Sequence, residues 1–192
     1  MNILIDRLPS TLTVGGISYK INSDFRTSIL FELMMQDRAL TNEEKLLNAI
    51  ELYFQEIPKD LEEAINKIVW FYKCGKEEEE REVTNSNSNS KQIYSFEHDA
   101  EYIYSAYLSQ YGIDLQDIEG LHWWKFKAMF QGLNESNEIV KIMGYRALDL
   151  NEIKDKKQKA HYRKLKQLYK LPDNRTEEEK EQMVADAFAG LF

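Results

Sequence analysis

From Asp24 onward, apolar residues recur with the period of an α-helix, and this pattern constrains the fold more than any other feature. Spacings of four and five residues place the first set on one helical face. Its members are Phe25, Ile29, Leu30, Leu33 and Met34. Turn formers are scarce, with 8 Gly and 3 Pro among 192 residues, whereas a β-sandwich or barrel needs a turn about every 8–12 residues. We therefore predict a mainly α (α+β) fold with a helical bundle.

Capping sequences delimit the predicted helices. Ser23 or Asp24 caps the first, and Thr41 with Glu44 forms a capping box, in which each side chain satisfies a backbone N–H of the other residue. Asp60 opens a third helix, which closes at Gly75. The same signals predict further helices over residues 95–112, 121–132, 136–150 and 152–171, and another after a capping box at Thr176.

The first 22 residues differ, because they predict strands. Two β-branched runs, 11–14 and 17–21, flank Gly15 and Gly16, which favour a two-residue hairpin turn. Residues 3–5 form a third strand-like run. A lone hairpin is marginally stable in water. We therefore expect a small N-terminal hairpin or short antiparallel sheet that packs on the helices, pairs with residues 3–5, or pairs with another copy of the chain.

The clearest break in the chain lies at residues 76–92. Five glutamates fall between residues 77 and 82, and residues 85–90 alternate Asn and Ser, with nothing apolar to bury. We predict an acidic, Asn/Ser-rich linker or loop between an N-terminal region, residues 1–75, and a C-terminal helical region, residues 93–192. The pattern leaves open whether these two regions share one core.

The chain is acidic overall, with 33 Asp plus Glu against 25 Lys plus Arg and a net charge of -8. No stretch approaches the roughly 20 apolar residues that a membrane helix needs, and no signal-peptide pattern opens the sequence. The single cysteine, Cys74, excludes an intrachain disulfide and a multi-cysteine zinc site. We expect a cytoplasmic protein without a membrane partner.

Catalytic and metal-binding patterns are weak. Glu119 and His122 have the i, i+3 spacing of a di-iron half-site, but a di-iron bundle needs that pair twice, and neither other histidine has a glutamate three residues before it. Cys74 lies at a predicted helix C-terminus, where the helix dipole disfavours the reactive thiolate. Motifs for phosphate binding, dinucleotide binding and nucleophilic catalysis are missing from the sequence. We predict a protein that is not an enzyme, with no catalytic, metal, cofactor or small-molecule site.

One candidate contact region is a dense aromatic segment at residues 121–130. At helical spacing, Trp123, Phe126 and Phe130 share a face, which indicates a core position. Adjacent helical residues diverge by about 100°, so Trp124 should point elsewhere and lie exposed between two lysines. Tryptophan is enriched among interface anchors. The protein-interaction candidates of this segment are Trp123, Trp124, Phe126, Met129 and Phe130.

A second candidate is the basic segment 154–170, which carries eight basic residues and one acid. Such a segment could bind nucleic-acid phosphates, with affinity that falls steeply as salt rises. Alternatively, it is a solvated face or a contact with an acidic neighbouring subunit. Because the whole chain is acidic, we favour the solvated or intersubunit interpretation over nucleic acid. The candidate residues are Lys156, Lys157, Arg163 and Lys164.

Residues 111–115 read Tyr-Gly-Ile-Asp-Leu, and His122-Trp123-Trp124 follows this connection. These segments are the most specific part of a resemblance to the gene-product-fifteen family of tailed phages with long flexible tails, and the resemblance spans nearly the whole chain. The other matching segments are Leu8-Pro9, Val14-Gly15-Gly16, Tyr19, the helix at 27–33, the Trp-Phe-Tyr-Lys cluster at 70–73, and residues 94–107.

This resemblance implies a phage protein that behaves like a tail assembly chaperone. Such chaperones coat the long apolar tape measure protein, recruit tail tube subunits, and leave before the virion matures. The resemblance carries over no catalytic residue. It implies a binding protein in the host cytoplasm that is absent from the mature virion. We separately expect the protein to be non-catalytic and to form a homo-oligomer. A nucleic-acid-binding phage factor and a structural tail component are the alternatives.

Overall fold

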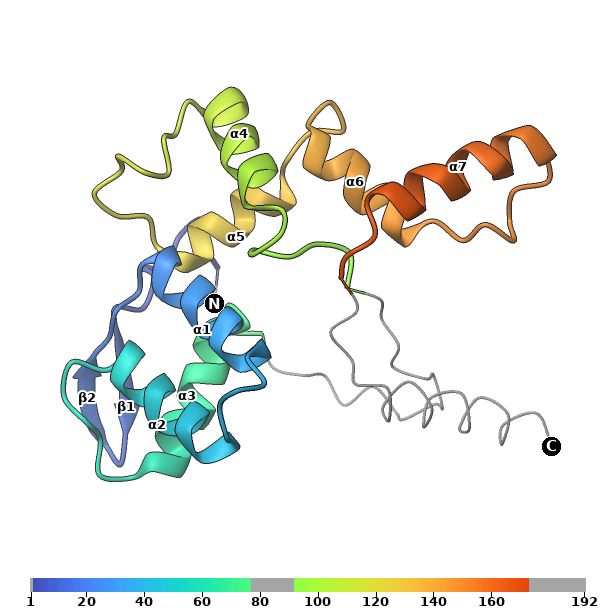
Figure 1. Ribbon diagram of the computed structural model, residues 1–192. Coiled ribbons are helices and arrows are strands. Elements are labelled where there is room, and N and C mark those ends of the chain that lie inside the picture. The colour runs from blue at the N-terminus through green and yellow to red at the C-terminus, as the bar shows by residue number, and fades with distance from the viewer. Residues whose placement is uncertain (1, 77–91, 173–192) are drawn as a thin grey trace. The chain divides into compact units, whose positions relative to one another are not determined.

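The computed structural model describes residues 2–76 and 92–172 (Figure 1). Within these ranges the protein is mainly α-helical, with an antiparallel hairpin at its N-terminal end, as predicted. None of the described helices is long and apolar enough to cross a lipid bilayer. The elements in chain order are β1 (Thr11–Val14), β2 (Ile17–Lys20), α1 (Phe25–Gln36), α2 (Asn42–Tyr53), α3 (Leu61–Tyr72), α4 (Ala100–Tyr111), α5 (Trp123–Gln131), α6 (Glu138–Ala147) and α7 (Lys156–Leu168).

The chain divides into two compact units, Met1–Met143 and Gly144–Phe192. The boundary falls inside α6, and the first unit contains both the residues before the predicted linker and those after it as far as Met143. Most of the predicted linker, residues 77–91, lies outside the described residues, as does the helix predicted after Thr176.

The predicted hairpin is confirmed. Strands β1 and β2 pair from Thr11 opposite Lys20 to Val14 opposite Ile17. Gly15 and Gly16 have φ values of 57° and 76°, so both adopt the left-handed conformation that this tight turn requires. The inner side chains of β1, Leu12 and Val14, are buried, and β1 packs on α3. The hairpin therefore gains its stability from the helices.

The strand prediction for residues 3–5 is wrong, because these residues form a turn. The amide of Asp6 donates to the Asn2 carbonyl at 2.8 Å, and the Asn2 amide donates to the Asp6 carboxylate at 2.6 Å. This local ring of hydrogen bonds replaces pairing with the hairpin. Leu4 and Ile5 are consequently exposed, at 87% and 80% of their surfaces.

Side-chain caps begin α1, α2 and α3. Asp24 accepts from the Arg26 amide at 3.0 Å to cap α1, and both hydrogen bonds of the Thr41 and Glu44 capping box are present at α2. Asp60 caps α3. Helix α4 begins at residue 100, five residues later than predicted, because residues 95–99 form a turn that the Asp99 carboxylate closes on the residue-95 amide.

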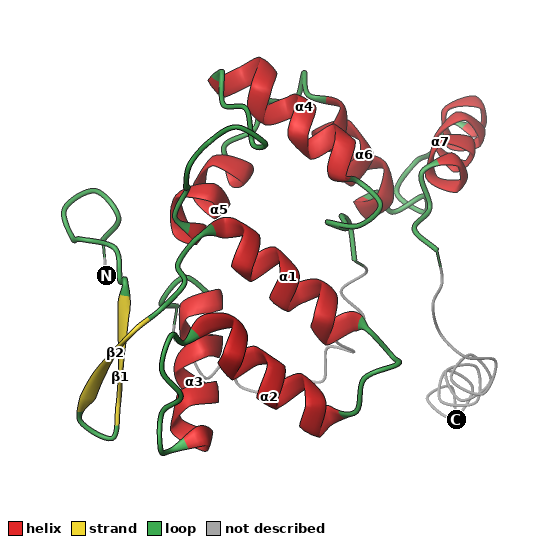
Figure 2. Ribbon diagram, turned by 60° about the vertical axis from the view of Figure 1, so that its left-hand side comes forward, coloured by secondary structure: helices red, strands yellow, loops and turns green. Residues whose placement is uncertain are grey.

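One core spans the regions on both sides of residues 77–91. Helix α1 lies between α2 and α5 (Figure 2). Phe25 of α1 stacks on Phe126 of α5, with ring centroids 4.9 Å apart and planes 9° apart. In this unit, residues from the N-terminal and C-terminal regions of the sequence therefore bury each other.

The described part of the second unit consists of the end of α6, α7 and their connections. Tyr145 packs against Tyr162 and Tyr169, with ring centroids 6.3 and 5.9 Å away. Arg146 donates to the Tyr169 carbonyl at 2.6 Å. No residue of α7 is buried. Stacked tyrosines and backbone hydrogen bonds therefore hold this helix, in place of an apolar core.

Candidate protein-interaction site

The two tryptophans of α5 lie in the core. Trp123 is fully buried, and Trp124 is 4% exposed. Their indole N–H groups donate to the carbonyls of Tyr72 at 2.8 Å and Phe71 at 2.7 Å. These carbonyls lie at the end of α3, where a helix leaves its last acceptors without helical partners, and the Phe71 carbonyl also accepts from the Cys74 amide at 3.0 Å. The tryptophan pair therefore completes the C-terminus of α3.

The prediction that Trp124 is exposed is wrong, and its neighbours give the reason. The end of α3 covers the side of α5 that the helical period assigned to solvent. Trp70 and Phe71 place their rings 5.5 and 5.9 Å from the Trp124 ring. Gly75, with φ of 70°, makes room: a Cβ there would lie 2.7 Å from the Trp124 ring. Trp124 is thus unavailable as a surface anchor in the folded protein.

The rest of the aromatic segment is also largely internal. Phe126 is fully buried between the stacked rings of Phe25 and Tyr107, 4.9 and 4.8 Å away. The Tyr107 hydroxyl donates to the Phe126 carbonyl at 2.6 Å, and burial raises the pKa of Tyr107. Phe130 is 6% exposed and Met129 is half-buried. Of these five candidates, Met129 alone retains substantial exposure.

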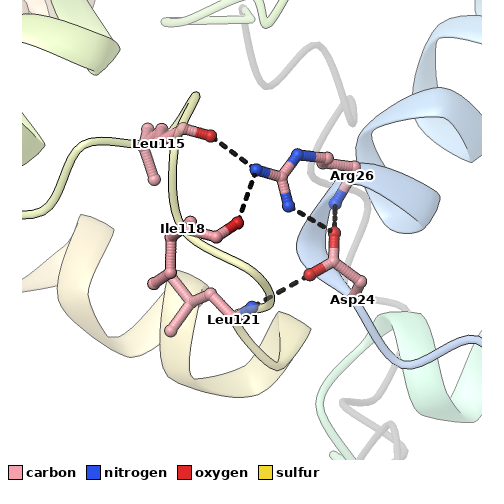
Figure 3. A network of polar contacts seen from close by, with 5 residues as sticks. All are labelled: Asp24, Arg26, Leu115, Ile118 and Leu121. Carbon is pink, nitrogen blue, oxygen red and sulfur yellow. Dashed lines mark hydrogen bonds and ion pairs between the residues drawn. The ribbon is translucent and has the colours of Figure 1, made fainter.

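A polar network joins the start of α1 to the connection before α5 (Figure 3). The Asp24 carboxylate accepts from the amides of Arg26 and Leu121, at 3.0 and 2.9 Å. The Arg26 guanidinium donates to the carbonyls of Leu115 and Ile118, at 2.7 and 3.1 Å. The ion pair between Asp24 and Arg26 therefore caps α1 and also binds the connection before α5, roughly ninety residues away in sequence.

His122 has a structural role. Its Nδ1 accepts from the Trp124 amide at 3.1 Å and caps α5, so its Nε2 carries the hydrogen that it donates to the Pro9 carbonyl at 3.0 Å. Burial lowers the pKa of His122. Glu119, its partner in the i, i+3 pair, is exposed. Among the described residues, no group of three or more His, Cys, Asp or Glu side chains could hold a metal ion.

Cys74 lies just after α3 with φ of 59° and is half-buried. Burial raises the pKa of its thiol, which disfavours the thiolate that nucleophilic chemistry requires. The geometry therefore supports a structural position for this residue.

Helix α1 carries a partly open apolar surface formed by residues of the apolar stripe that the sequence pattern predicts. The buried residues of α1 are Phe25, Ser28 and Phe31. Of the five side chains in the predicted stripe, Phe25 is buried, Leu30 is 54% exposed, and the other three are half-buried. We call these four residues the α1 face: Ile29, Leu30, Leu33 and Met34. Phe31 lies outside the predicted stripe, and its large apolar side chain is the sequence signal that a different side of α1 faces the core.

The basic candidates lie on α7 in the second unit. Lys156, Lys157, Arg163 and Lys164 are all exposed. The only acid of the segment, Asp155, caps the helix by accepting from the residue-158 amide at 2.7 Å. Four positive side chains are therefore presented to solvent on a single helix of 13 residues.

Comparison with protein families identifies the chain. A family model described as Bacteriophage Gp15 protein matches residues 4–171. The chain belongs to the bacteriophage Gp15 family. No curated protein and no solved structure matches it. The Gp15 match covers the hairpin, the aromatic core and α7, so both units described here contain Gp15 sequence.

Proposed function

We propose that this Gp15-family protein is a non-catalytic tail assembly chaperone of a long-tailed phage, and that it binds an apolar helical segment of the tape measure protein in the host cytoplasm. The observation that carries the proposal is the α1 face, an apolar helical surface that the protein's own core leaves partly open. Tail tube subunits are the second partner that the family resemblance implies.

The chemistry of the α1 face suits such a client. Its members lie at i, i+1, i+4 and i+5, the spacing at which one helix lays apolar side chains against another. Met34 adds an unbranched, adaptable side chain, which tolerates clients of varied sequence. A net charge of -8 favours solubility of copies that carry no client. The α1 face therefore serves client binding, while the negative charge of the whole chain favours solubility.

Co-expression with the tape measure protein tests the proposal. We expect the wild-type chain to keep the client soluble and to elute with it in gel filtration. Leu30→Glu should abolish the complex, because it places a charge at the centre of the apolar contact. Leu108→Glu on α4 is the matched control, since Leu108 is 43% exposed and lies outside the α1 face. An insoluble client, or equal loss with both variants, contradicts the proposal.

The exposed basic residues of α7 favour nucleic-acid binding as a second candidate function. That function requires binding of DNA or RNA that weakens as salt rises and disappears when Lys156, Lys157, Arg163 and Lys164 are changed to Glu. No mobility shift at about 50 mM salt would eliminate it. A structural tail component, the third candidate, would appear in mass spectrometry of purified virions, whereas the chaperone would be missing.

A further inference from the structure

The basic helix α7 has a counterpart on the surface of the first unit. Residues 154–170 carry eight basic side chains and one acidic side chain, a charge of +7. Because the whole chain carries -8, the remaining residues carry -15. Each copy therefore combines one strongly positive helix with a strongly negative remainder of the sequence. Such a distribution attracts α7 of one copy to an acidic region of the next.

The outward side of α7 has a defined pattern. Lys156, Ala160 and Lys164 follow one another at intervals of four residues, so they form one stripe along the helix. Ala160 and Lys164 are each two residues from Tyr162, about 160° around the helix from the side that packs on Tyr145. All three are exposed. The stripe therefore presents a small apolar side chain between two positive charges.

Helix α2 bears the complementary pattern. Glu43, Leu47 and Glu51 also follow at intervals of four residues, and all three are exposed, Leu47 at 48% of its surface. Within the described residues, no side-chain hydrogen bond or ion pair engages either glutamate or the two lysines of the α7 stripe. This stripe presents a large apolar side chain between two negative charges.

The two stripes match in length and in size. In each stripe the two charged residues are eight positions apart in sequence, which places them about 12 Å apart along the helix axis. The large Leu47 and the small Ala160 occupy the two central positions, so a leucine fits against an alanine where the helix backbones approach. Both charge pairs can then form at once.

We propose that α7 of one copy packs on α2 of a second copy, with Lys156 and Lys164 facing Glu43 and Glu51 and with Leu47 resting on Ala160. This contact joins copies of the protein in the absence of any client. It also provides the buried apolar surface that α7 lacks, since an isolated helix of this length is marginally stable in water. The contact is independent of the α1 face, so its test does not depend on the tape measure protein.

The test is charge-reversal mutagenesis of the full-length protein, with self-association measured by sedimentation equilibrium at low and high salt. Wild type should self-associate at low salt and dissociate as salt rises. The double variants Glu43→Lys/Glu51→Lys and Lys156→Glu/Lys164→Glu should each lower the association constant about tenfold, because two attractive pairs become repulsive. An equimolar mixture of the two variants should recover association, since each variant's changed helix meets the complementary helix of the other.

The mixture separates a lost contact from a lost fold, because a misfolded variant cannot be rescued by its partner. Glu119→Lys/Glu135→Lys is the matched control: both glutamates are exposed, and the charge change is the same. The control should associate like wild type. The proposal is overturned by a wild type that stays monomeric at its highest soluble concentration, by a control that weakens equally, or by a mixture that remains dissociated. Nucleic-acid binding lost in Lys156→Glu/Lys164→Glu with unchanged self-association overturns it as well.

Discussion

Helices α5 and α7 differ in what surrounds them. In α5, Trp123, Trp124, Phe126 and Phe130 are buried, and α1, α3 and α4 contribute the rings or carbonyls that cover them. In α7, no residue is buried, and one tyrosine of α6 supplies the aromatic contacts. Aromatic density in this protein marks where distant segments meet, whereas charge density marks a helix whose residues stay outside the core.

The largest expected effect comes from truncating a residue at the centre of α5. Trp123→Ala removes a fully buried ring, its stacking on Tyr72 and its hydrogen bond to the Tyr72 carbonyl. We expect the free energy of unfolding to fall by about 3–5 kcal/mol in urea denaturation. Leu168→Ala on α7, where the leucine is 71% exposed, should change it by less than about 0.5 kcal/mol. A similar loss of unfolding free energy in the two variants would contradict the conclusion that α5 lies in the core and α7 outside it.

A smaller effect isolates the space that Trp124 requires. Gly75 and Gly112 both have positive φ, 70° and 65°, so alanine is strained at either position by about 1 kcal/mol. A Cβ at Gly75 would also lie 2.7 Å from the Trp124 ring, whereas one at Gly112 meets nothing within 4 Å. Gly75→Ala should therefore cost about 2–4 kcal/mol and Gly112→Ala about 1 kcal/mol. If thermal unfolding shows the same loss of stability for both variants, then the Trp124 ring moves aside for the added methyl group at residue 75 at no measurable cost in free energy.

The smallest effect is a pH dependence at the start of α5. Burial lowers the pKa of His122 below its ordinary value of 6.5, so the unfolded chain binds this proton more readily. The stability contributed by neutral His122 is complete above pH 6.5 and is lost as the pH falls through the lowered pKa. His122→Asn keeps an N-cap acceptor but does not titrate. The difference in unfolding free energy between wild type and this variant should therefore shrink on acidification, and a constant difference would contradict this role.

Local features of the fold were predictable from the sequence. The Gly15-Gly16 turn and the Thr41 and Asp60 caps depend on residues within a few positions of each other, and all were confirmed. The exposure of the basic residues on α7 was predictable for a similar reason, since several like charges on one short helix cannot be buried unpaired.

Features that depend on distant segments were not predictable. Trp124 is buried because residues 70–75 pack on it, and no periodicity within α5 reports that contact. Leu30 is exposed because the inward side of α1 follows Ser28 and Phe31, and Ser28 shares a buried hydrogen bond with Tyr53. Residues 3–5 form a turn because Asn2 and Asp6 bond to each other. In each case, tertiary partners or polar side chains outweighed the apolar pattern.

The bonds between His122 and Pro9 and between Leu121 and Asp24 join residues 113 and 97 positions apart. Helical proteins usually fold quickly because most of their contacts are local, and long loop closures slow folding. A chain that emerges from the ribosome with α3 complete still lacks the two indoles that bond to the Phe71 and Tyr72 carbonyls and pack on the end of this helix. We therefore expect the N-terminal helices to have an incomplete core until α5 is synthesised, and a chain cut short before residue 123 to aggregate.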